Sequence, residues 1–307
     1  MTRPLEIAFV NNMPDAALAA THAQFSRLLR AAAGERDVKL RGYTLPGHER
    51  GEAARRYLAG TYDSINALYR RGADAIIVTG CEPRAARLPD EPYWPHLTRL
   101  VDWARDHTTA AIWSCLAAHA AALHLAGIER QPAPRKISGI YRFACLETEW
   151  ARRDAAEIIV PHSRYNGLPR AELERTGFRI GSWSAEAGVD MFWREEPSLF
   201  VFLQGHPEYD GDTLLKEYRR DVIRFLAGKR PDYPDAPEHF FSGDNASGLR
   251  ALKSRVEAGA ERDPIGALTD IIGAEPCAQQ WAGDARGLFQ GWLTAIGARS
   301  GDHRRSA

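Results

Sequence analysis

The stretch from Ala110 to His119, Ala-Ala-Ile-Trp-Ser-Cys-Leu-Ala-Ala-His, decides the fold of this chain. A short apolar run precedes Cys115, and an Ala- and Leu-rich segment without proline follows it as far as Gly127. This pattern predicts a buried strand, an abrupt turn at the cysteine and a helix. A thiol at such a turn faces solvent, and the free N–H groups and partial positive charge of the helix N-terminus favour its thiolate. Cys115 is therefore the candidate nucleophile.

The segment from Phe202 to Asp210, Phe-Leu-Gln-Gly-His-Pro-Glu-Tyr-Asp, supplies the groups that a nucleophilic cysteine needs. The apolar run over 198–204 predicts a strand that ends just before His206. Because residues two apart in an extended chain project to the same side, Glu208 can reach the ring of His206. Beside Cys115, these side chains would act as general base and orienting carboxylate. Taken singly, a buried structural cysteine and a surface histidine are the alternatives.

Length and composition indicate a globular protein without a strongly charged partner. The 307 residues suffice for a full core in one domain or slightly more. Forty basic residues balance forty acidic ones, which gives no reason to expect binding to nucleic acid or to an anionic membrane. We find neither an apolar run of about 18 residues nor a leader segment, and therefore expect a cytoplasmic protein. The four cysteines show no metal-ligand spacing, so we expect free thiols and no metal site.

The first half of the chain alternates apolar runs with helical patterns. We expect strands over 5–10, 38–45, 73–80 and 110–114, and helices over 16–33, 62–71, 94–107 and 116–127. Such alternation predicts an α/β fold with a mostly parallel sheet and helices on both faces. Ligands of these sheets gather at the carboxyl ends of the strands. Residues that follow such ends are Asn12, Gly80, Cys115 and His206.

The second half begins with shorter extended segments. We expect antiparallel or mixed strands over 137–146, 156–161, 178–184 and 188–193, all added to the same sheet. The last of them pairs with 199–204 in a hairpin, and a helix over 213–226 ends at Gly228. We therefore expect a first domain over 1–228 and a helical C-terminal extension over 229–307 that packs on it. Its helices end near 296, and a disordered tail starts at about residue 297.

Seven segments, read together, carry a family resemblance: Val10–Pro14, Val78–Gly80, Tyr93–Pro95, the turn at Cys115, Lys136–Tyr141, Pro161–Tyr165 and Gly205–Asp210. In this order they resemble the homoserine O-acyltransferases of the succinyltransferase type. The resemblance implies a fold similar to class I glutamine amidotransferases and a homodimer. It further implies transfer of an acyl group from succinyl-CoA or acetyl-CoA to the side-chain hydroxyl of homoserine, an early step of methionine synthesis, without a bound cofactor.

The chemistry of the resemblance fits the residues already singled out. Cys115 as thiolate would attack the thioester to give an acyl-cysteine, and His206 would take the proton of the acceptor hydroxyl, in a ping-pong scheme. Backbone N–H groups would hold the oxyanion. The expected donors are that of Leu116 and one from the turn at Asn12 and Met13.

Further positions match substrate-contacting residues of the family: Lys136, Ser163 and Arg220. Arg220 suits the α-carboxylate of the amino acid, because a guanidinium binds a carboxylate through two parallel hydrogen bonds. Read alone, these residues would be a surface lysine, a turn serine and a solvated helix charge. Their assignment therefore rests on the resemblance.

Two positions depart from the family pattern. Many relatives carry lysines after Met13-Pro14, where this chain has Asp15-Ala16-Ala17. Arg84 occupies the position expected for acyl-donor selectivity, usually a glycine in succinyl users and a glutamate in acetyl users. Since arginine can pair with a succinyl carboxylate that glutamate would repel, this position favours succinyl-CoA, although a long side chain also fills space.

Three alternatives stay open. The acceptor can be serine or another hydroxy amino acid. A glutamine amidotransferase-type hydrolase shares the expected fold and triad, but it would need a synthase partner, and its cysteine usually has flanking glycines where Ser114 and Leu116 stand here. A non-catalytic binding protein that keeps the fold is the third, and the presence of all three triad residues argues against it.

Overall fold

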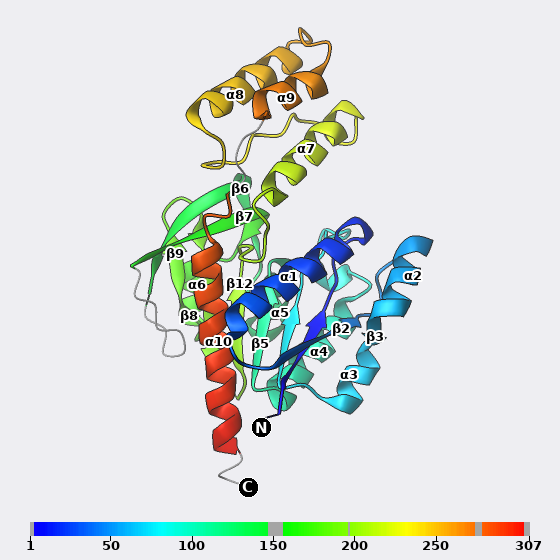
Figure 1. Cartoon of the computed structure of the whole chain (residues 1–307), viewed down its shortest axis with the longest axis vertical. Helices are drawn as coiled ribbons and strands as arrows, with labels where there is room; N and C mark the ends of the chain where they lie inside the picture. The colour runs from blue at the N-terminus through cyan, green and yellow to red at the C-terminus, as the bar shows by residue number, and fades with distance from the viewer. Residues whose placement is uncertain (1–2, 147–155, 196, 274–277, 304–307) are drawn as a thin grey trace.

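A mostly parallel sheet lies at the centre of the molecule (Figure 1). This computed structural model describes residues 3–146, 156–195, 197–273 and 278–303. Within them the central sheet has eight strands in the order β3-β2-β1-β4-β5-β12-β11-β8, and the first six run parallel. Their bounds are β1 (Leu5–Val10), β2 (Val38–Thr44), β3 (Tyr62–Ser64), β4 (Ala75–Val78), β5 (Ala110–Ser114), β8 (Arg179–Ile180), β11 (Met191–Glu195) and β12 (Leu199–Leu203).

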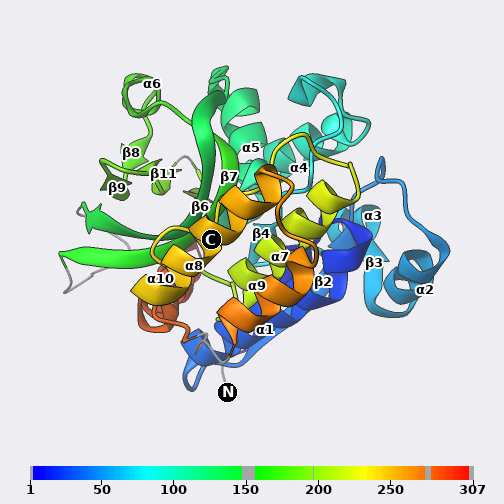
Figure 2. The same cartoon turned by 90° about the horizontal axis from the view of Figure 1, so that it is seen from above.

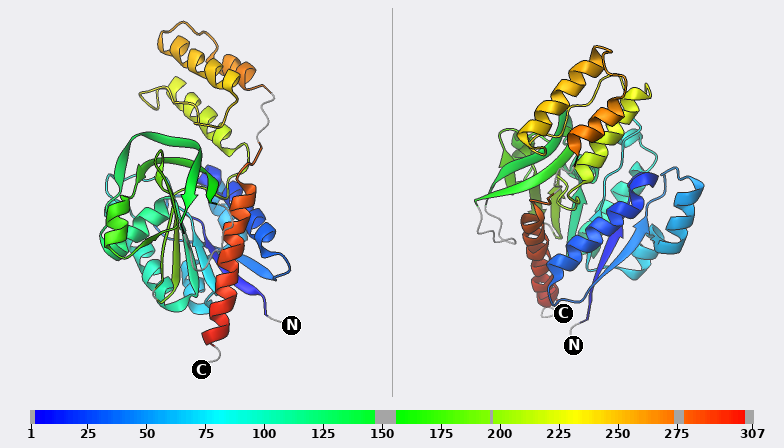
Figure 3. Two further views of the ribbon diagram at one scale, coloured as in Figure 1. Left: turned by 90° about the vertical axis from the view of Figure 1, so that its left-hand side faces the viewer. Right: turned by 45° about the horizontal axis from the view of Figure 1, so that its top comes forward.

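Successive residues of the central strands face opposite helical layers. In β4, Ile76 and Val78 belong to one buried cluster and Ala75 and Ile77 to another. The first layer is formed by α3 (Ile65–Arg71), α4 (Trp94–His107) and α5 (Leu116–Ala126), and the second by α1 (Leu18–Ala33) and α10 (Ala282–His303). Figure 3 shows α10 running along the body of the molecule. Apolar runs buried on both faces are typical of parallel strands, and the predicted fold class is confirmed.

A second, four-stranded sheet carries part of the chain that we expected in the central sheet. It consists of β6 (Gln131–Cys145), β7 (Glu157–Gly167), β9 (Ser182–Ser184) and β10 (Gly188–Val189) in the order β10-β9-β6-β7. Only β8, β11 and β12 joined the central sheet as expected, β11 and β12 as the predicted antiparallel hairpin. The separation has a physical reason, because β6 and β7 bury their own cluster around Tyr141, Phe143, Ile158 and Val160.

Three helices form a layer that stands above the body (Figures 1 and 2). These cap helices are α7 (Thr213–Leu226), α8 (Gly243–Glu257) and α9 (Pro264–Ile272). Tyr218 and Val222 of α7 pack in one apolar cluster with residues of α8 and α9. We propose that the cap helices form one unit, which spans the boundary expected at 228. The expected disordered tail from about 297 differs from the structure, since α10 continues to His303.

Two helices were missed in the sequence: α2 (Glu52–Thr61) and α6 (Arg170–Arg175). Each buries a single side chain, Ala54 in α2 and Leu173 in α6. Neither therefore shows the apolar stripe by which a helix is recognised. The helix expected over 62–71 starts as strand β3 and becomes α3 at Ile65.

We predict that Phe289→Ala lowers the free energy of unfolding by about 3–5 kcal/mol, the usual cost of removing a buried aromatic ring. The Phe289 side chain is fully buried in α10 and lies against Phe25 of α1, with ring centroids 6.3 Å apart. Urea unfolding measures the change, and Gln290→Ala, at the exposed neighbouring position, is the control. A loss below about 1 kcal/mol would mean that α10 is not part of the core.

Candidate active site

Cys115 lies at a strained turn between β5 and α5. Its backbone has φ 53° and ψ −116°, a left-handed conformation that L-residues rarely adopt. Its N–H donates to the carbonyl oxygen of Leu203 over 2.7 Å, which ties the turn to β12. A non-glycine residue held in this region costs about 1–3 kcal/mol, and such strain clusters at functional sites. The predicted sequence of strand, turn and helix around the cysteine is confirmed.

The pairing of β5 with β12 brings the histidine to the cysteine. The two strands are parallel neighbours, with Ser114 opposite Leu203, so Cys115 and His206 both lie just beyond this register. The Cys115 thiol is close enough to the His206 ring to interact with it electrostatically and to raise the pKa of His206. His206 Nδ1 lies 2.9 Å from Glu208 Oε1, and these two residues are 6% and 5% exposed. The three side chains that the sequence singled out are therefore in one place.

The charge on His206 is set by its two neighbours. Burial lowers the pKa of an imidazole, but the negative charges of Cys115 and Glu208 and their hydrogen bonds outweigh burial and raise the pKa of His206 well above 6.5. The ring also stacks on Tyr209, with centroids 4.3 Å apart, and Tyr209 donates to Glu217 over 2.9 Å. The arrangement therefore favours the protonated imidazolium form of His206 beside the sulfur of Cys115.

The expected oxyanion donors are only partly available. Leu116 is the first residue of α5, so its N–H has no acceptor within the helix. A Cβ on Gly80 would lie 2.7 Å from this nitrogen, so glycine leaves the approach to it open. The N–H of Asn12 donates to Thr79 Oγ1 over 2.8 Å, and that of Met13 to Asn11 Oδ1 over 3.2 Å. In this structure the turn at Asn12 and Met13 thus uses its N–H groups internally.

Lys136 and Arg220 meet at a carboxylate that sequence reasoning missed. Asp221, which is buried, lies 2.9 Å from Lys136 Nζ and 3.0 Å from Arg220 Nη2. Burial opposes its charge, but these two cations outweigh burial and lower the pKa of Asp221. The side chain of Arg220 remains 48% exposed, so part of its fork faces outward. The sequence does contain a signal for Asp221, because this acidic residue directly follows Arg220, a candidate binding residue.

Ser163 lies on β7 directly opposite Ser138 of β6. The same segment contacts the catalytic loop, because His206 N–H donates to the Pro161 carbonyl over 2.8 Å. A second polar pocket, lined by Lys136, Ser138 and Tyr165 among others, opens between β6 and the cap helices. Lys136 and Ser138 thus share this pocket with Tyr218 and Asp221 of α7.

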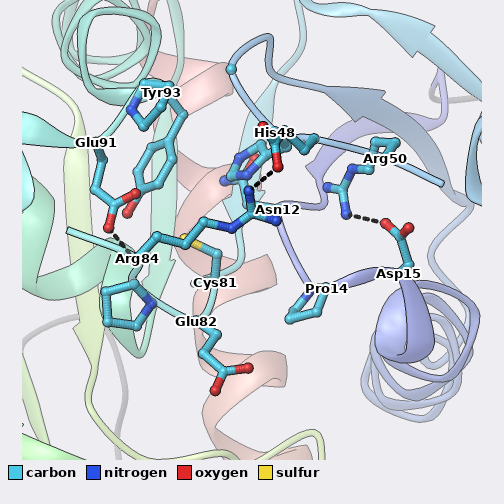
Figure 4. Close-up of a pocket in the computed structure, with 14 residues that line it drawn as sticks. Asn12, Pro14, Asp15, His48, Arg50, Cys81, Glu82, Arg84, Glu91 and Tyr93 are labelled. Carbon is cyan, nitrogen blue, oxygen red and sulfur yellow. Dashed lines mark hydrogen bonds and ion pairs between the residues drawn. The ribbon is translucent and has the colours of Figure 1, made fainter.

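A separate cavity of about 470 Å³ lies at the carboxyl ends of β1, β2 and β4 (Figure 4). It is lined by the loops after β1, β2 and β4, from which Figure 4 shows Asn12, His48, Arg50, Cys81 and Arg84. Arg84, expected at the acyl-donor position, does line this cavity. Its guanidinium pairs with Glu49 over 2.5 Å, and its side chain is 64% exposed. Arg50 was not singled out from the sequence, because nothing in the surrounding pattern distinguishes it from other arginines.

Two further features concern the described part of the chain only. Within it no cluster of His, Cys, Asp and Glu side chains has the arrangement of a metal site. None of its helices combines the length and apolar character needed to span a membrane. Cys81 and Cys115 are free thiols, whereas Cys277 lies outside the described residues.

Comparison with known proteins matches the chain to one family over almost its whole length. The family model of homoserine O-succinyltransferase covers residues 1–299. Homoserine O-succinyltransferases from Rhodopseudomonas palustris and Bradyrhizobium japonicum are each 46% identical to the chain, over 96% and 94% of it and 89% of each relative. Similar solved structures include a glutamine amidotransferase from Thermotoga maritima, at 14% identity and a TM-score of 0.48, over 85% of this chain and 100% of that one. The chain belongs to the homoserine O-succinyltransferase family.

Proposed function

We propose that this protein transfers a succinyl group from succinyl-CoA to the hydroxyl of L-homoserine through an acyl-cysteine intermediate. The observation that carries the mechanism is that Cys115 and His206 follow two paired strands, with His206 hydrogen-bonded to Glu208 and interacting electrostatically with Cys115. Family membership supports the substrates. The co-substrate is an acyl-CoA, and the residues named here need no bound cofactor. From the sequence resemblance we further propose a cytoplasmic homodimer.

In the first half-reaction the thiolate of Cys115 attacks the thioester carbonyl. The new S–C bond forms as the carbonyl electrons move to oxygen, and the N–H of Leu116 donates to that oxyanion. When the carbonyl re-forms, the bond to the CoA sulfur breaks. The imidazolium of His206 gives its proton to the departing CoA thiolate, so the ring is left neutral and the cysteine acylated.

In the second half-reaction the neutral ring acts as a base. Its Nδ1 is engaged by Glu208, so we assign Nε2 to proton transfer. This nitrogen takes the proton of the homoserine hydroxyl while the oxygen attacks the acyl-cysteine carbonyl. Collapse of the second tetrahedral intermediate expels the Cys115 thiolate, which restores the ion pair with the protonated His206.

The acceptor is proposed to bind on the side of β6, β7 and α7. Arg220 would take the α-carboxylate through its exposed fork, while Asp221 fixes the guanidinium from the other side. Lys136 and Ser163 would complete the polar surface around the amino acid. Serine as the acceptor, one methylene shorter, would place its hydroxyl farther from the acyl-cysteine when its carboxylate is held by Arg220.

Intact mass spectrometry tests the intermediate. Mixing the protein with succinyl-CoA is expected to add one succinyl group, which peptide mapping locates on Cys115 and which L-homoserine removes. Cys115→Ala and Cys115→Ser are expected to form no thioester. Serine as the competing acceptor and glutamine as the substrate of an amidohydrolase are run in parallel. An adduct on Cys81 or Cys145, or glutaminase activity without acylation, would contradict the proposal.

Glu208→Gln is expected to lower the titration midpoint of His206, since the variant loses the carboxylate charge that helps to raise its pKa. NMR of the imidazole C–H protons measures it, and kcat is expected to fall by about 10²–10⁴-fold. Because the folded-state pKa of His206 is raised, its contribution to stability is complete below pH ~6.5 and is lost as pH rises through the folded value. In Glu208→Gln the decrease in stability with rising pH should be smaller than in the wild type.

The control for Glu208→Gln is Glu186→Gln. Glu186 pairs with His239 at the surface over 3.0 Å, so the same chemical change is made outside the site. Its kcat and the titration of His206 should match those of the wild type. An unchanged His206 midpoint in Glu208→Gln would refute the orienting role of the carboxylate.

Gly80→Ala is expected to reduce kcat by about 10²–10³-fold, the usual cost of an oxyanion donor. The new methyl group would lie 2.7 Å from the Leu116 nitrogen and block the place of the oxyanion. Steady-state kinetics measures the loss, and circular dichroism checks the fold. Gly60→Ala, where a Cβ meets no atom within 4 Å, is the control. Full activity of Gly80→Ala would exclude Leu116 as the donor.

A further inference from the structure

The cavity of Figure 4 lies next to the nucleophile. Cys81 lines it and interacts electrostatically with Cys115, and burial is the main cause that raises the pKa of Cys81 to about 12. Gly80, the neighbour of Cys81, lies against Leu116 at the start of α5. Asn12 lines the cavity from the adjoining strand end. An acyl group on Cys115 therefore has this cavity on the side of β4 and β1.

Arg50 places a fixed positive charge in the cavity wall. Its side chain is only 10% exposed. One guanidinium nitrogen, Nη1, donates to the Met13 carbonyl over 2.6 Å and lies 3.1 Å from Asp15 Oδ1. Asp15 is held in turn by the N–H of Gly51 over 2.8 Å. The other nitrogen, Nη2, is buried and has no acceptor within the described part of the chain. A buried guanidinium nitrogen calls for an acceptor, and an anion is the strongest one.

The other charges of the cavity already have partners. Glu91 accepts the N–H groups of Arg84 and Ala85 over 2.6 and 2.8 Å. Glu49 pairs with the guanidinium of Arg84, and Glu82 lies 3.4 Å from an arginine of α7. Both arginines are ion-paired, but Arg84 is largely in solvent, whereas Arg50 is buried and keeps an unpartnered donor at Nη2. A charge interaction is stronger at the buried group.

His48 adds a second polar group to the same wall. Burial and the neighbouring Arg50 and Arg84 lower its pKa to about 4, so the ring is neutral near pH 7. Its face stacks on Tyr93, with centroids 4.7 Å apart. The buried Nε2 has no partner in the described structure. In the tautomer that carries the proton there, a neutral imidazole donates one hydrogen bond without repelling the guanidinium.

We propose that Arg50 binds the terminal carboxylate of the succinyl group and is the residue that selects succinyl-CoA over acetyl-CoA. This inference rests on the proposed function. The succinyl carboxylate is two methylenes from the carbonyl that Cys115 attacks. Its binding site must therefore lie close to the turn at Cys115, as this cavity does. The phosphates of CoA lie at the far end of the pantetheine arm and are the other anions of the donor. Asp15 positions Arg50. This role would explain why the chain has an acidic residue where the family resemblance predicts lysines.

The test compares two donors on Arg50→Gln. Mass spectrometry follows the rate of acylation of Cys115 against donor concentration, so the acceptor plays no part. Succinyl-CoA acylation efficiency should fall about 10–100-fold, the range for one charged hydrogen bond, and acetyl-CoA efficiency by less than about threefold. Arg50→Lys keeps the charge and should lose less with succinyl-CoA. Arg56→Gln, at an exposed arginine outside the cavity, is the control.

Free succinate gives a readout that needs no reaction. Calorimetry should detect its binding to the wild type and to Arg50→Lys, and a loss of binding in Arg50→Gln. An equal loss with both donors would overturn the inference in favour of the phosphates or of a structural role. If Arg50→Gln does not fold, the wild type and Arg50→Lys decide the test. The absence of succinate binding to both proteins would then refute the inference. If succinate binding depends on Arg50 but succinyl-CoA does not acylate Cys115, the proposed function is refuted and the inference about Arg50 is not.

Discussion

The parallel pairing of β5 with β12 is the constraint on which the site depends. These strands are far apart in sequence, yet the hydrogen bond from Cys115 N–H to the Leu203 carbonyl fixes one directly against the other at the point where both end. A shift of the register by one residue would turn the apolar side chains of β12 to the opposite helical layer. Because the strand is buried on both faces, the register is strongly specified. The position of His206 relative to the thiol is therefore set by the core.

The backbone strain at Cys115 accompanies this placement of the thiol beside His206. Cys115 keeps a left-handed backbone because β5 and α5 are both anchored in the apolar layers that cover the sheet. The turn aims the sulfur outward and leaves the first N–H of α5 beside it. Gly80 completes the arrangement from the neighbouring strand, since any side chain there would meet Leu116. Cys115 and Leu116 follow β5, His206 follows β12 and Gly80 follows β4, so the candidate site is assembled at three neighbouring strand ends of one sheet.

Elements could be predicted from the sequence where neighbouring residues alone determine the local structure. The strand over 5–10, the helix over 94–107 and the turn at Cys115 were predicted because buried parallel strands and amphipathic helices have strong periodicities. The separate sheet of β6 and β7 was not predicted, because the choice between two sheets depends on long-range packing. The N–H groups of Asn12 and Met13 were expected to be free, but bonds to side chains of the same turn and of Thr79 use them.

Buried ionisable groups were hardest to anticipate, because burial alone does not give the sign of their behaviour. His206 and His48 are both desolvated, yet the first has two anionic neighbours and its pKa is raised, whereas the second faces two guanidinium groups and its pKa is lowered. One neighbour in each environment, Glu208 or Arg50, is two residues away in sequence, but the other, Cys115 or Arg84, comes from a distant segment. Arg50 was overlooked for the same reason, since its partner Asp15 comes from another loop. Such groups are assigned from three-dimensional neighbours and not from motifs.

The strand order also suggests how a ping-pong enzyme can keep two carboxylate groups apart. In the central sheet β1, β2 and β4 lie on one side of β5, and the loops that follow them build the cavity around Arg50, whereas β12 lies on the other side. Arg220 lies on α7 and is paired with Asp221. In the second half-reaction the acyl group must stay bound while the acceptor enters. With the roles proposed above, Arg50 and Arg220 as two separate cations allow this, because neither substrate has to displace the other from its counter-charge. A site with a single arginine would force the two carboxylates to compete and would repel the second one electrostatically.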